Sequence, residues 1–435
     1  MSFSEVPKEI QAFILSKLDG CSLVRAQRTC KLWYETIHKL ERIFHIWLMC
    51  CLKEVDTDIL VDITGLVKLA SLDSKDAVSL LGAMPWHLWR AVYAEFHRAR
   101  YINLDTQKTI ELYFFMGYGM VTCLHMKGDV FVSGHEGGNI VTWKNIDADV
   151  EANIIHRHQR IVTDITVLDA GTEDELWAGK MKPVVVSASR DSTLKVNSLE
   201  KCLTTEVHCY SSQVNQISSW GNSFVAAADK SMLQGQPVWR VITDSSGLHI
   251  QTKFHLTGQK TANMKAVALW GDEIMTGDEL GNVFYKKIGV ANSRLPANDP
   301  IELDFIANLG SIIETIIIKG QKVLCFTGNR NIYTSIDRRT FAKHDMFESL
   351  QKLAECVYLW GSILAIGCKM GSVFLYHLQS KEDWQGLDLS KPNHSFHTGS
   401  EHINAMAIGD DGAGPVLAIA TEDPVIHIVR WRRKK

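Results

Sequence analysis

The chain has 435 residues, of which 46% are hydrophobic and 22% are charged. This is the composition of a globular protein, and the length exceeds what one ordinary core serves, so more than one domain is expected. The net charge of -3 gives no general attraction to nucleic acid. Neither a basic-apolar leader nor an 18-residue apolar run occurs in the sequence, so we expect no signal peptide and no membrane span.

Ten cysteines are spread along the chain without a C-x-x-C pair, so neither a disulfide framework nor a zinc site is expected. Reduced thiols favour a location in the cytoplasm or the nucleus. The basic run from Arg430 to Lys435 suits either a nuclear-import signal or a solvated tail. No phosphate loop, nucleophile elbow or zinc-binding histidine motif is present, so we expect no catalytic residue, cofactor or metal.

The first fifty residues predict a compact helical module. Pro7 can occupy a first helical turn, where its missing N–H costs nothing. Ile10, Ile14 and Leu18 then fall on one face of the helix. The pair Asp19-Gly20 is expected to end it.

A second helix is expected to follow, with Ser22 as its N-cap. Apolar side chains again recur at helical spacing, at Leu23, Ala26, Cys30, Trp33 and Ile37. A bundle this small buries too little apolar area to be stable alone, so its amphipathic surface predicts a partner protein. The alternative is that these stripes form only an intramolecular core.

Residues 51–105 predict a helical spacer. Apolar residues at helical spacing between Leu60 and Leu81 indicate short amphipathic helices, and Pro85–Phe96 indicates another. No Gly/Ser-rich or Pro-rich linker occurs, so the spacer is expected to hold two domains at a defined separation. The segment Thr109–Phe115 predicts a strand.

Seven similar β-rich units follow one another from about Met120 to Arg432. In each, a small residue opens a tight turn between two apolar runs, at Gly134, Ala188, Ala227, Gly277, Gly328, Gly367 and Ala420. Their mean spacing of about 48 residues is the length of a propeller blade. One such sheet cannot bury both faces alone, so residues 106–435 predict a closed seven-bladed β-propeller. The last unit has only three strands, and Thr109–Phe115 is expected to supply the fourth.

The repeats resemble the WD-repeat family. The run Ser187-Ala188-Ser189-Arg190-Asp191, followed by Leu194 and Val196, is similar to that family's S-G-S-x-D-x-x-[IL]-x-[VIL]-W core. Trp143 and Trp431 stand where its strand-ending Trp belongs. No blade ends in Trp-Asp, and the family's Gly-His pair is missing or reduced to lone histidines such as His158 and His255, which puts its hydrogen-bonded tetrad in doubt for most blades.

Residues 1–50 resemble an F-box, a module that likewise precedes the propeller in F-box/WD-repeat proteins. The pattern is carried in order by Val6-Pro7-x-Glu9-Ile10, Ile14-Leu15, Leu18-Asp19, Leu23, Ala26, Cys30-Lys31, Trp33 and Trp47. The resemblance implies a small all-α F-box domain plus an all-β seven-bladed propeller. It also implies a non-catalytic substrate receptor of a Skp-cullin-F-box (SCF) ubiquitin ligase, with a cullin-RING core. The residues that would bind the Skp-type adaptor are Pro7, Ile10, Leu15, Leu18, Leu23 and Cys30.

The target protein is expected at the turns of the propeller, which converge on one face. The third residues of the seven small-residue turns are Glu136, Arg190, Asp229, Glu279, Arg330, Lys369 and Glu422. In similar proteins arginines at this turn pair with phosphorylated segments, which makes Arg190, Arg330 and Lys369 candidates for substrate binding. A plain solvated charge is the alternative at each position.

Two other functions stay open at this point. One is a non-catalytic propeller scaffold in which the N-terminal helices only cap the ring. The other is a hydrolase or lyase that uses the central channel of the propeller, which clustered carboxylates or a bound metal would favour.

Overall fold

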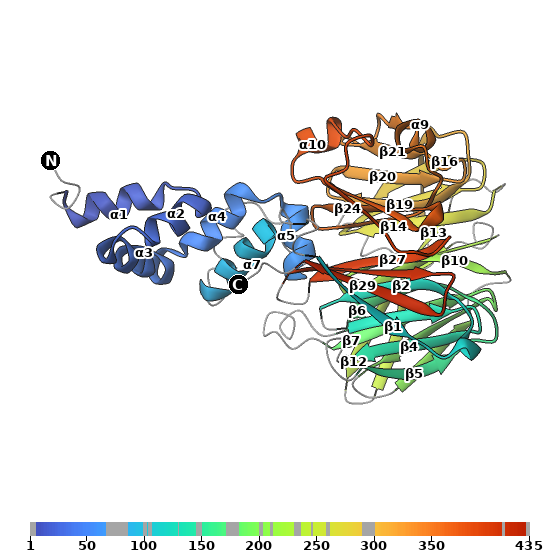
Figure 1. Ribbon diagram of the computed structural model, residues 1–435. Helices are drawn as coiled ribbons and strands as arrows, with labels where there is room; N and C mark the ends of the chain where they lie inside the picture. Colours follow the sequence, from blue (N-terminus) through green and yellow to red (C-terminus); the bar gives the residue numbers. More distant parts are fainter. Residues whose placement is uncertain are drawn as a thin grey trace. The chain divides into compact units, whose positions relative to one another are not determined.

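The computed structural model describes residues 6–66, 86–98, 102, 107–128, 130–144, 150–170, 182–199, 203–208, 212–229, 236–244, 247–257, 262–288, 301–410 and 414–431. The chain divides into two compact units, Met1–Arg100 and Tyr101–Lys435. The first unit is helical and the second consists of β-sheets (Figure 1). Both predicted fold classes, an N-terminal helical module and a β-propeller, are confirmed.

The helices of the first unit do not stop at residue 50. They are α1 (Lys8–Ser16), α2 (Gly20–Gln27), α3 (Lys31–Phe44), α4 (Ile46–Glu54), α5 (Thr57–Thr64) and α7 (Trp86–Arg98). Helix α4 crosses the predicted boundary, and α7 packs on α3, α4 and α5. The helices expected of a spacer are therefore part of the first unit, while the helices predicted between residues 67 and 81 lie outside the described residues.

The break between α1 and α2 differs from the prediction. Asp19, not Ser22, caps α2: its carboxylate accepts hydrogen bonds from the Ser22 backbone N–H at 2.8 Å and from the Ser22 hydroxyl at 2.7 Å. These bonds lower the pKa of Asp19. Gly20 is the first residue of α2. A glycine is needed at this position because a Cβ there would lie 2.3 Å from the ring of Tyr93. The Tyr93 hydroxyl in turn donates to Glu54 at 2.5 Å, which fixes α7 on α4.

A buried carboxylate holds four helices of the first unit together. Glu41 of α3 is fully buried and accepts hydrogen bonds from Trp47 Nε1 at 2.7 Å and Gln27 Nε2 at 2.9 Å. His38 Nδ1 lies 2.9 Å from the other oxygen, Oε2, and Arg90 Nη1 of α7 lies 3.5 Å from the first oxygen, Oε1. A buried charge is stable only with such partners, so Glu41 fixes how α2, α4 and α7 meet α3.

The second unit contains seven sheets, as predicted. The first four blades are β2 (Val121–Lys127), β3 (Val130–His135), β4 (Asn139–Lys144) and β5 (Glu151–Arg157); β6 (Val162–Asp169), β7 (Pro183–Ser189), β8 (Thr193–Ser198) and β9 (Leu203–His208); β10 (Val214–Trp220), β11 (Ser223–Ala228), β12 (Gln236–Asp244) and β13 (Gly247–Thr257), with β17 (Ile301–Glu302) beside β13; and β14 (Met264–Trp270), β15 (Glu273–Asp278), β16 (Asn282–Lys287) and β18 (Asp304–Asn308).

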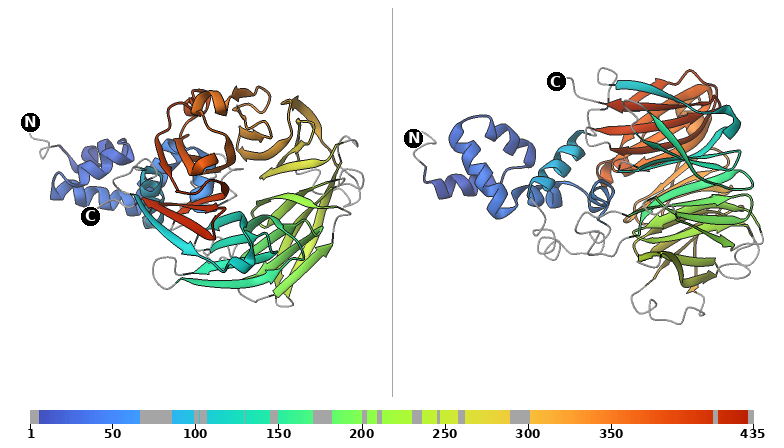
Figure 2. Two further views of the ribbon diagram at one scale, coloured as in Figure 1. Left: turned by 45° about the vertical axis from the view of Figure 1, so that its right-hand side comes forward. Right: turned by 90° about the horizontal axis from the view of Figure 1, so that it is seen from below.

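The remaining blades complete the ring (Figure 2). They are β19 (Ile313–Lys319), β20 (Lys322–Thr327), β21 (Ile332–Ser335) and β22 (Ala342–His344); β23 (Ala354–Trp360), β24 (Ile363–Cys368), β25 (Ser372–His377) and β26 (His394–His397); and β27 (Ile403–Asp410), β28 (Pro415–Thr421), β29 (Val425–Trp431) and β1 (Gln107–Tyr113). The short helices η5 (Met116–Tyr118), α9 (Met346–Leu350), η8 (Lys369–Gly371) and α10 (Lys381–Gln385) lie in its loops.

The N-terminal strand of this unit closes the ring. All seven residues of β1 pair with β29 in antiparallel register, from Gln107 opposite Trp431 to Tyr113 opposite Val425. The expectation that Thr109–Phe115 supplies the last strand of blade seven is confirmed. Arg430 is a correction, because it is buried within β29 opposite Lys108 and is not part of a solvated tail. The rest of the predicted tail, residues 432–435, lies outside the described residues.

The hairpins between the first two strands of the blades form a repeat that the sequence analysis missed. Five of them begin with a glycine at φ between 54° and 62°, at Gly128, Gly221, Gly271, Gly320 and Gly361. Glycine adopts this left-handed conformation without steric cost, which a two-residue hairpin turn requires. The residue before each glycine is Lys127, Trp220, Trp270, Lys319 or Trp360, always the last of the innermost strand.

Neighbouring blades are joined by the side chains that end or line these innermost strands. The rings of Trp220 and Trp270 lie 4.1 Å apart between their centroids, and Lys319 Nζ lies 5.5 Å from the Trp270 ring. Within the innermost strands themselves, the carboxylate of Asp164 in β6 accepts a hydrogen bond from the Ile217 backbone N–H of the next blade at 2.7 Å. Burial raises the pKa of Asp164 to about 7. Polar side chains of one blade thus satisfy backbone groups of the next, as burial demands.

We predict that Glu41→Ala destabilises the first unit by about 3–5 kcal/mol, because it leaves the Trp47 N–H and the Gln27 amide buried without an acceptor. The measurement is chemical unfolding of the full chain, followed by a signal from the helices. Glu35→Ala, which removes an exposed carboxylate from the same helix, should change stability by less than about 0.5 kcal/mol. Equal effects of the two substitutions would contradict the role given to Glu41.

We also predict that Leu112→Ala in the closing strand costs about 2–5 kcal/mol of propeller stability, because Leu112 is buried in the core shared by blades seven and one. Glu111→Ala, which changes a partly exposed neighbour in the same strand, should be nearly neutral. Thermal unfolding monitored by β-sheet circular dichroism checks both. If the melting temperature of Leu112→Ala were unchanged, the pairing of β1 with β29 would not limit propeller stability.

Candidate functional site

Helix α1 presents an apolar face that the first unit leaves uncovered. Ile10, Phe13 and Ile14 are 50%, 61% and 40% exposed, and their spacing places them side by side on the helix. Tyr34 of α3 is also exposed, and Lys17 Nζ lies 5.1 Å above the Phe13 ring. Apolar side chains exposed together in this way mark a protein-binding surface more often than singly exposed ones do.

The six predicted adaptor-binding residues divide into two groups. Pro7, Ile10 and Cys30 are exposed, and Leu18 is half-buried. Leu15 and Leu23 are buried in the core of the first unit. We therefore correct the role of Leu15 and Leu23 to support of the helices, because a buried side chain cannot contact a partner directly. Phe13, which the sequence analysis passed over, takes their place on the exposed face.

In the propeller, the turns between the second and third strands lie at the same end as the loops that lead into the first strands. Backbone N–H groups of the turns donate to carbonyls of those loops, in the pairs Glu136 to Met120, Arg190 to Ile161, Asp229 to Gln213, Glu279 to Asn263, Gly328 to Ile312 and Lys369 to Leu353. These turns and loops form one face of the ring, which we call the turn face. It is the surface on which the sequence analysis placed the substrate site.

The backbone hydrogen bonds between turns and loops correct the predicted position of Arg330. The equivalent of Arg190 and Lys369 in blade five is Gly328, so Arg330 stands two residues further along its turn, at φ 62°. The strand register agrees, because Phe326 rather than Gly328 occupies the position of the small residue. Arg330 also has a partner already, since Nη1 lies 3.0 Å from Glu314. A phosphate would have to compete with this carboxylate.

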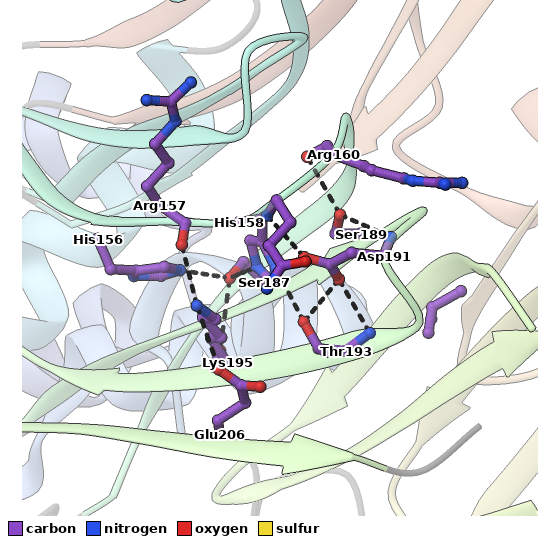
Figure 3. Close-up of polar contacts among 12 residues, drawn as sticks. His156, Arg157, His158, Arg160, Ser187, Ser189, Asp191, Thr193, Lys195 and Glu206 are labelled. Carbon is purple, nitrogen blue, oxygen red and sulfur yellow. Dashed lines mark hydrogen bonds and ion pairs between the residues drawn. The ribbon is translucent and has the colours of Figure 1, made fainter. Parts of the chain in front are cut away.

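Blade two carries a hydrogen-bonded chain of serine, histidine and aspartate (Figure 3). His158 Nε2 lies 2.8 Å from Ser187 Oγ, and His158 Nδ1 lies 3.1 Å from Asp191 Oδ2. The other oxygen of Asp191 accepts from the Thr193 hydroxyl at 2.6 Å. Burial lowers the pKa of His158 and lowers that of His156 to about 3, so both imidazoles are neutral at pH 7.

The hydrogen-bonded chain has a structural role, although its sequence of serine, histidine and aspartate matches that of a serine hydrolase. Ser187 has no exposed surface, and its hydroxyl also contacts His156 Nε2 at 3.0 Å. No substrate carbonyl can reach the oxygen without unfolding the blade. Sequence reasoning missed the partners of His158 because Ser187 and Asp191 lie about thirty residues away along the chain. Their effect is to fix the turn Ser189–Thr193 against the preceding loop.

Around the fixed turn lies a basic group that we call the basic corner: Arg157 at the end of β5, Arg160 in the loop before β6, and Arg190 on the turn itself. All three are exposed, and in Figure 3 the side chains of Arg157 and Arg160 extend away from the buried chain. Ser189 Oγ bonds to the Arg160 carbonyl at 3.2 Å, which places the two loops side by side. Neither Arg160 nor Arg190 pairs with a carboxylate among the residues the structure describes.

Lys369 lies in acidic surroundings instead. The neighbouring blade contributes Glu401 and Glu422, both exposed, with the Glu401 N–H donating to the Glu422 carboxylate at 3.2 Å. His402 Nδ1 lies 2.5 Å from Glu355. This hydrogen bond raises the pKa of His402. Of the three predicted substrate-binding residues, Arg190 alone therefore lies in a basic cluster.

Two searches of the described residues concern metals and membranes. No group of three or more His, Cys, Asp or Glu side chains there is placed to hold a metal ion. Within the same residues, none of the helices combines the length and apolarity needed to cross a bilayer.

Propeller stability is predicted to fall as pH drops from 7 to 5. Unfolded histidine takes up a proton near pH 6.5, whereas burial holds the pKa of His135 at about 4 and that of His156 at about 3. Stability is therefore complete above pH 6.5 and is lost below it, by about 2 kcal/mol per histidine at pH 5. His156→Gln should flatten the dependence measured by chemical unfolding at pH 7.5, 6 and 5. An identical slope in the variant would contradict the assignment.

One comparison with known protein families identifies part of the first unit. Residues 3–45 match the sequence model of a family described as F-box-like. The search of curated proteins gave no match. Among solved structures, the crystal structure of the computationally designed Ika8 protein is similar with 15% identity and a TM-score of 0.46, over 73% of this chain and 97% of that one. The chain therefore combines an F-box-like region at residues 3–45 with seven β-sheet blades that form a propeller.

Proposed function

We propose that this protein is the substrate receptor of an SCF ubiquitin ligase. In this role the first unit binds a Skp-type adaptor and, through it, a cullin-RING core, while the propeller binds the target protein. The receptor accelerates ubiquitin transfer by raising the local concentration of the target's lysines near the conjugating enzyme.

The exposed face of α1 carries this proposal. Ile10, Phe13 and Ile14 lie within the F-box-like region 3–45, and all three side chains are exposed. At the start of α3, Cys30 at the N-cap and Tyr34 in the first turn are exposed as well. An apolar helix face of this kind suits burial against helices of an adaptor.

The basic corner supports a target with an acidic or phosphorylated segment. Arg190 stands on the turn that the His158–Asp191 contact holds in place, and Arg157 and Arg160 flank His158 on the other side of that contact. Guanidinium groups bind phosphate through paired hydrogen bonds, and a fixed frame reduces the entropy lost on binding. The same Ser187, His158 and Asp191 contacts support assignment of the blades to the WD-repeat family.

A receptor needs no catalytic residue of its own, and we propose that the chain has none. F-box plus propeller architecture is typical of non-catalytic adaptor subunits. The burial of Ser187 argues against the one hydrolase-like arrangement found. We expect the protein in the cytoplasm, the nucleus or both. A scaffold without ubiquitin transfer is the alternative, and it requires no adaptor binding.

We predict that the double substitution Ile10→Ser with Phe13→Ser weakens adaptor binding about 100-fold, because each apolar side chain contributes roughly 1.5 kcal/mol when buried. The measurement is calorimetric titration of the full chain with purified Skp-type adaptor. Ile43→Ser, which changes an exposed apolar residue of α3 away from the α1 face, is the matched control and should bind within about threefold of the parent. A folded parent chain that does not bind would leave the scaffold alternative.

A further inference from the structure

The turn face carries a second group of residues that the basic corner does not explain. Blade six exposes Leu353 and Met370, blade seven exposes Glu401 and Glu422, and the segment leading into blade one exposes Phe115 and Met116. We call these six residues the apolar-acidic sector. Phe115, Met116 and Met370 are 70%, 75% and 62% exposed, which is unusual for side chains of this size.

Backbone contacts make the sector continuous across three blades. The Met370 N–H donates to the Glu401 carbonyl at 2.5 Å, and Glu401 in turn contacts the Glu422 carboxylate. Two residues beyond Glu422, the Pro424 carbonyl accepts from the Phe114 N–H at 3.3 Å, directly before Phe115. The order around the ring is therefore apolar on blade six, acidic on blade seven and apolar again at blade one.

The carboxylates of the sector remain available to a ligand. Glu401 and Glu422 are exposed, and neither forms an ion pair with a lysine or arginine among the described residues. Nearby, Ser400 Oγ donates to Asp423, a further exposed acid of the same blade. The three carboxylates Glu401, Glu422 and Asp423 outnumber Lys369, the exposed cation of the adjoining turn of blade six, and such an excess of negative charge attracts a cationic partner and sets its orientation.

We propose that the apolar-acidic sector binds an extended segment of the target protein in which a lysine or arginine lies between apolar side chains. The cation would lie over Glu401 and Glu422, with one apolar side chain against Met370 and Leu353 and the other against Phe115 and Met116. Methionine side chains adapt their shape to varied apolar ligands. This suits a surface that selects for a pattern of residue types and not for one particular residue. This inference rests on the proposed role of the propeller as a target receptor.

The neighbouring basic corner extends this pattern. Its residues Arg160 and Arg190 lie at blade two, next to blade one, so an acidic or phosphorylated residue that follows the second apolar side chain would reach them. Arg157 belongs to blade one, where its Nε donates to the Gly137 carbonyl at 3.1 Å, so the corner begins on the blade that follows Phe115 and Met116. The target segment would then be apolar, basic, apolar and acidic in order along the turn face.

The test is selection of random 12-residue peptides displayed on phage against the immobilised full chain, followed by fluorescence-polarisation titration of the enriched peptides after synthesis. The proposal predicts enrichment of lysine or arginine flanked by apolar residues. It predicts about tenfold weaker binding by Glu401→Gln with Glu422→Gln, and by Met116→Ser with Met370→Ser. It also predicts weaker binding of peptide to the parent chain at 0.5 M than at 0.1 M salt.

Leu280→Ser provides the matched control, because Leu280 is an equally exposed turn residue of the same face but belongs to blade four. It should bind the peptides within about twofold of the parent. Enrichment of peptides without the pattern, absence of any enrichment, or equal weakening by the control would overturn the proposal. Titration of the same preparations with the Skp-type adaptor separates this failure from failure of the receptor role, because the two tests use different units of the chain.

Discussion

The pairing of β1 with β29 is the constraint on which the propeller depends. Seven sheets arranged in a ring bury their faces against one another only if the first and last are joined, and an open ring would expose both a sheet edge and the core between blades seven and one. Seven consecutive residue pairs close that gap with a segment from the other end of the unit. The turn face, the basic corner and the apolar-acidic sector all depend on this closure, because each brings together residues of different blades.

Closure also explains why function is located in the turns. Innermost strands are occupied with contacts between blades, such as those of Asp164 with Ile217 and of Trp270 with Lys319. Exposed turn side chains such as Arg190 and Met370 take no part in those contacts, so charge and apolar surface can vary at such positions without loss of the core. In blade two, the buried His158 and Asp191 give one of these turns a fixed shape, while Arg190 on the turn and Arg160 beside it stay exposed to a ligand.

The features predicted from sequence are those set by local periodicity. The seven blades, the closing strand and the helical first module follow from repeated apolar spacing and from turn residues. What failed depends on contacts between distant residues. The buried contacts of Glu41 and the packing of Tyr93 on Gly20 make the described residues 51–66 and 86–98 part of the first unit, although their sequence suggests a spacer. Burial of Leu15 and Leu23 likewise could not be told from exposure, since both core and binding stripes have helical spacing.

Arg330 shows a different limit. Gly328 resembles the small residues of the other turns, but the strand register places Phe326 at that position and moves Arg330 out of alignment. A shift of two residues preserves the alternation of apolar side chains, so the pattern alone cannot reveal it.

Adaptor binding by α1 is tested most directly by amide hydrogen exchange of the full chain with and without a Skp-type adaptor. It predicts added protection in α1, Lys8–Ser16, with the propeller strands unchanged; protection confined to the propeller, or none at all, would contradict it.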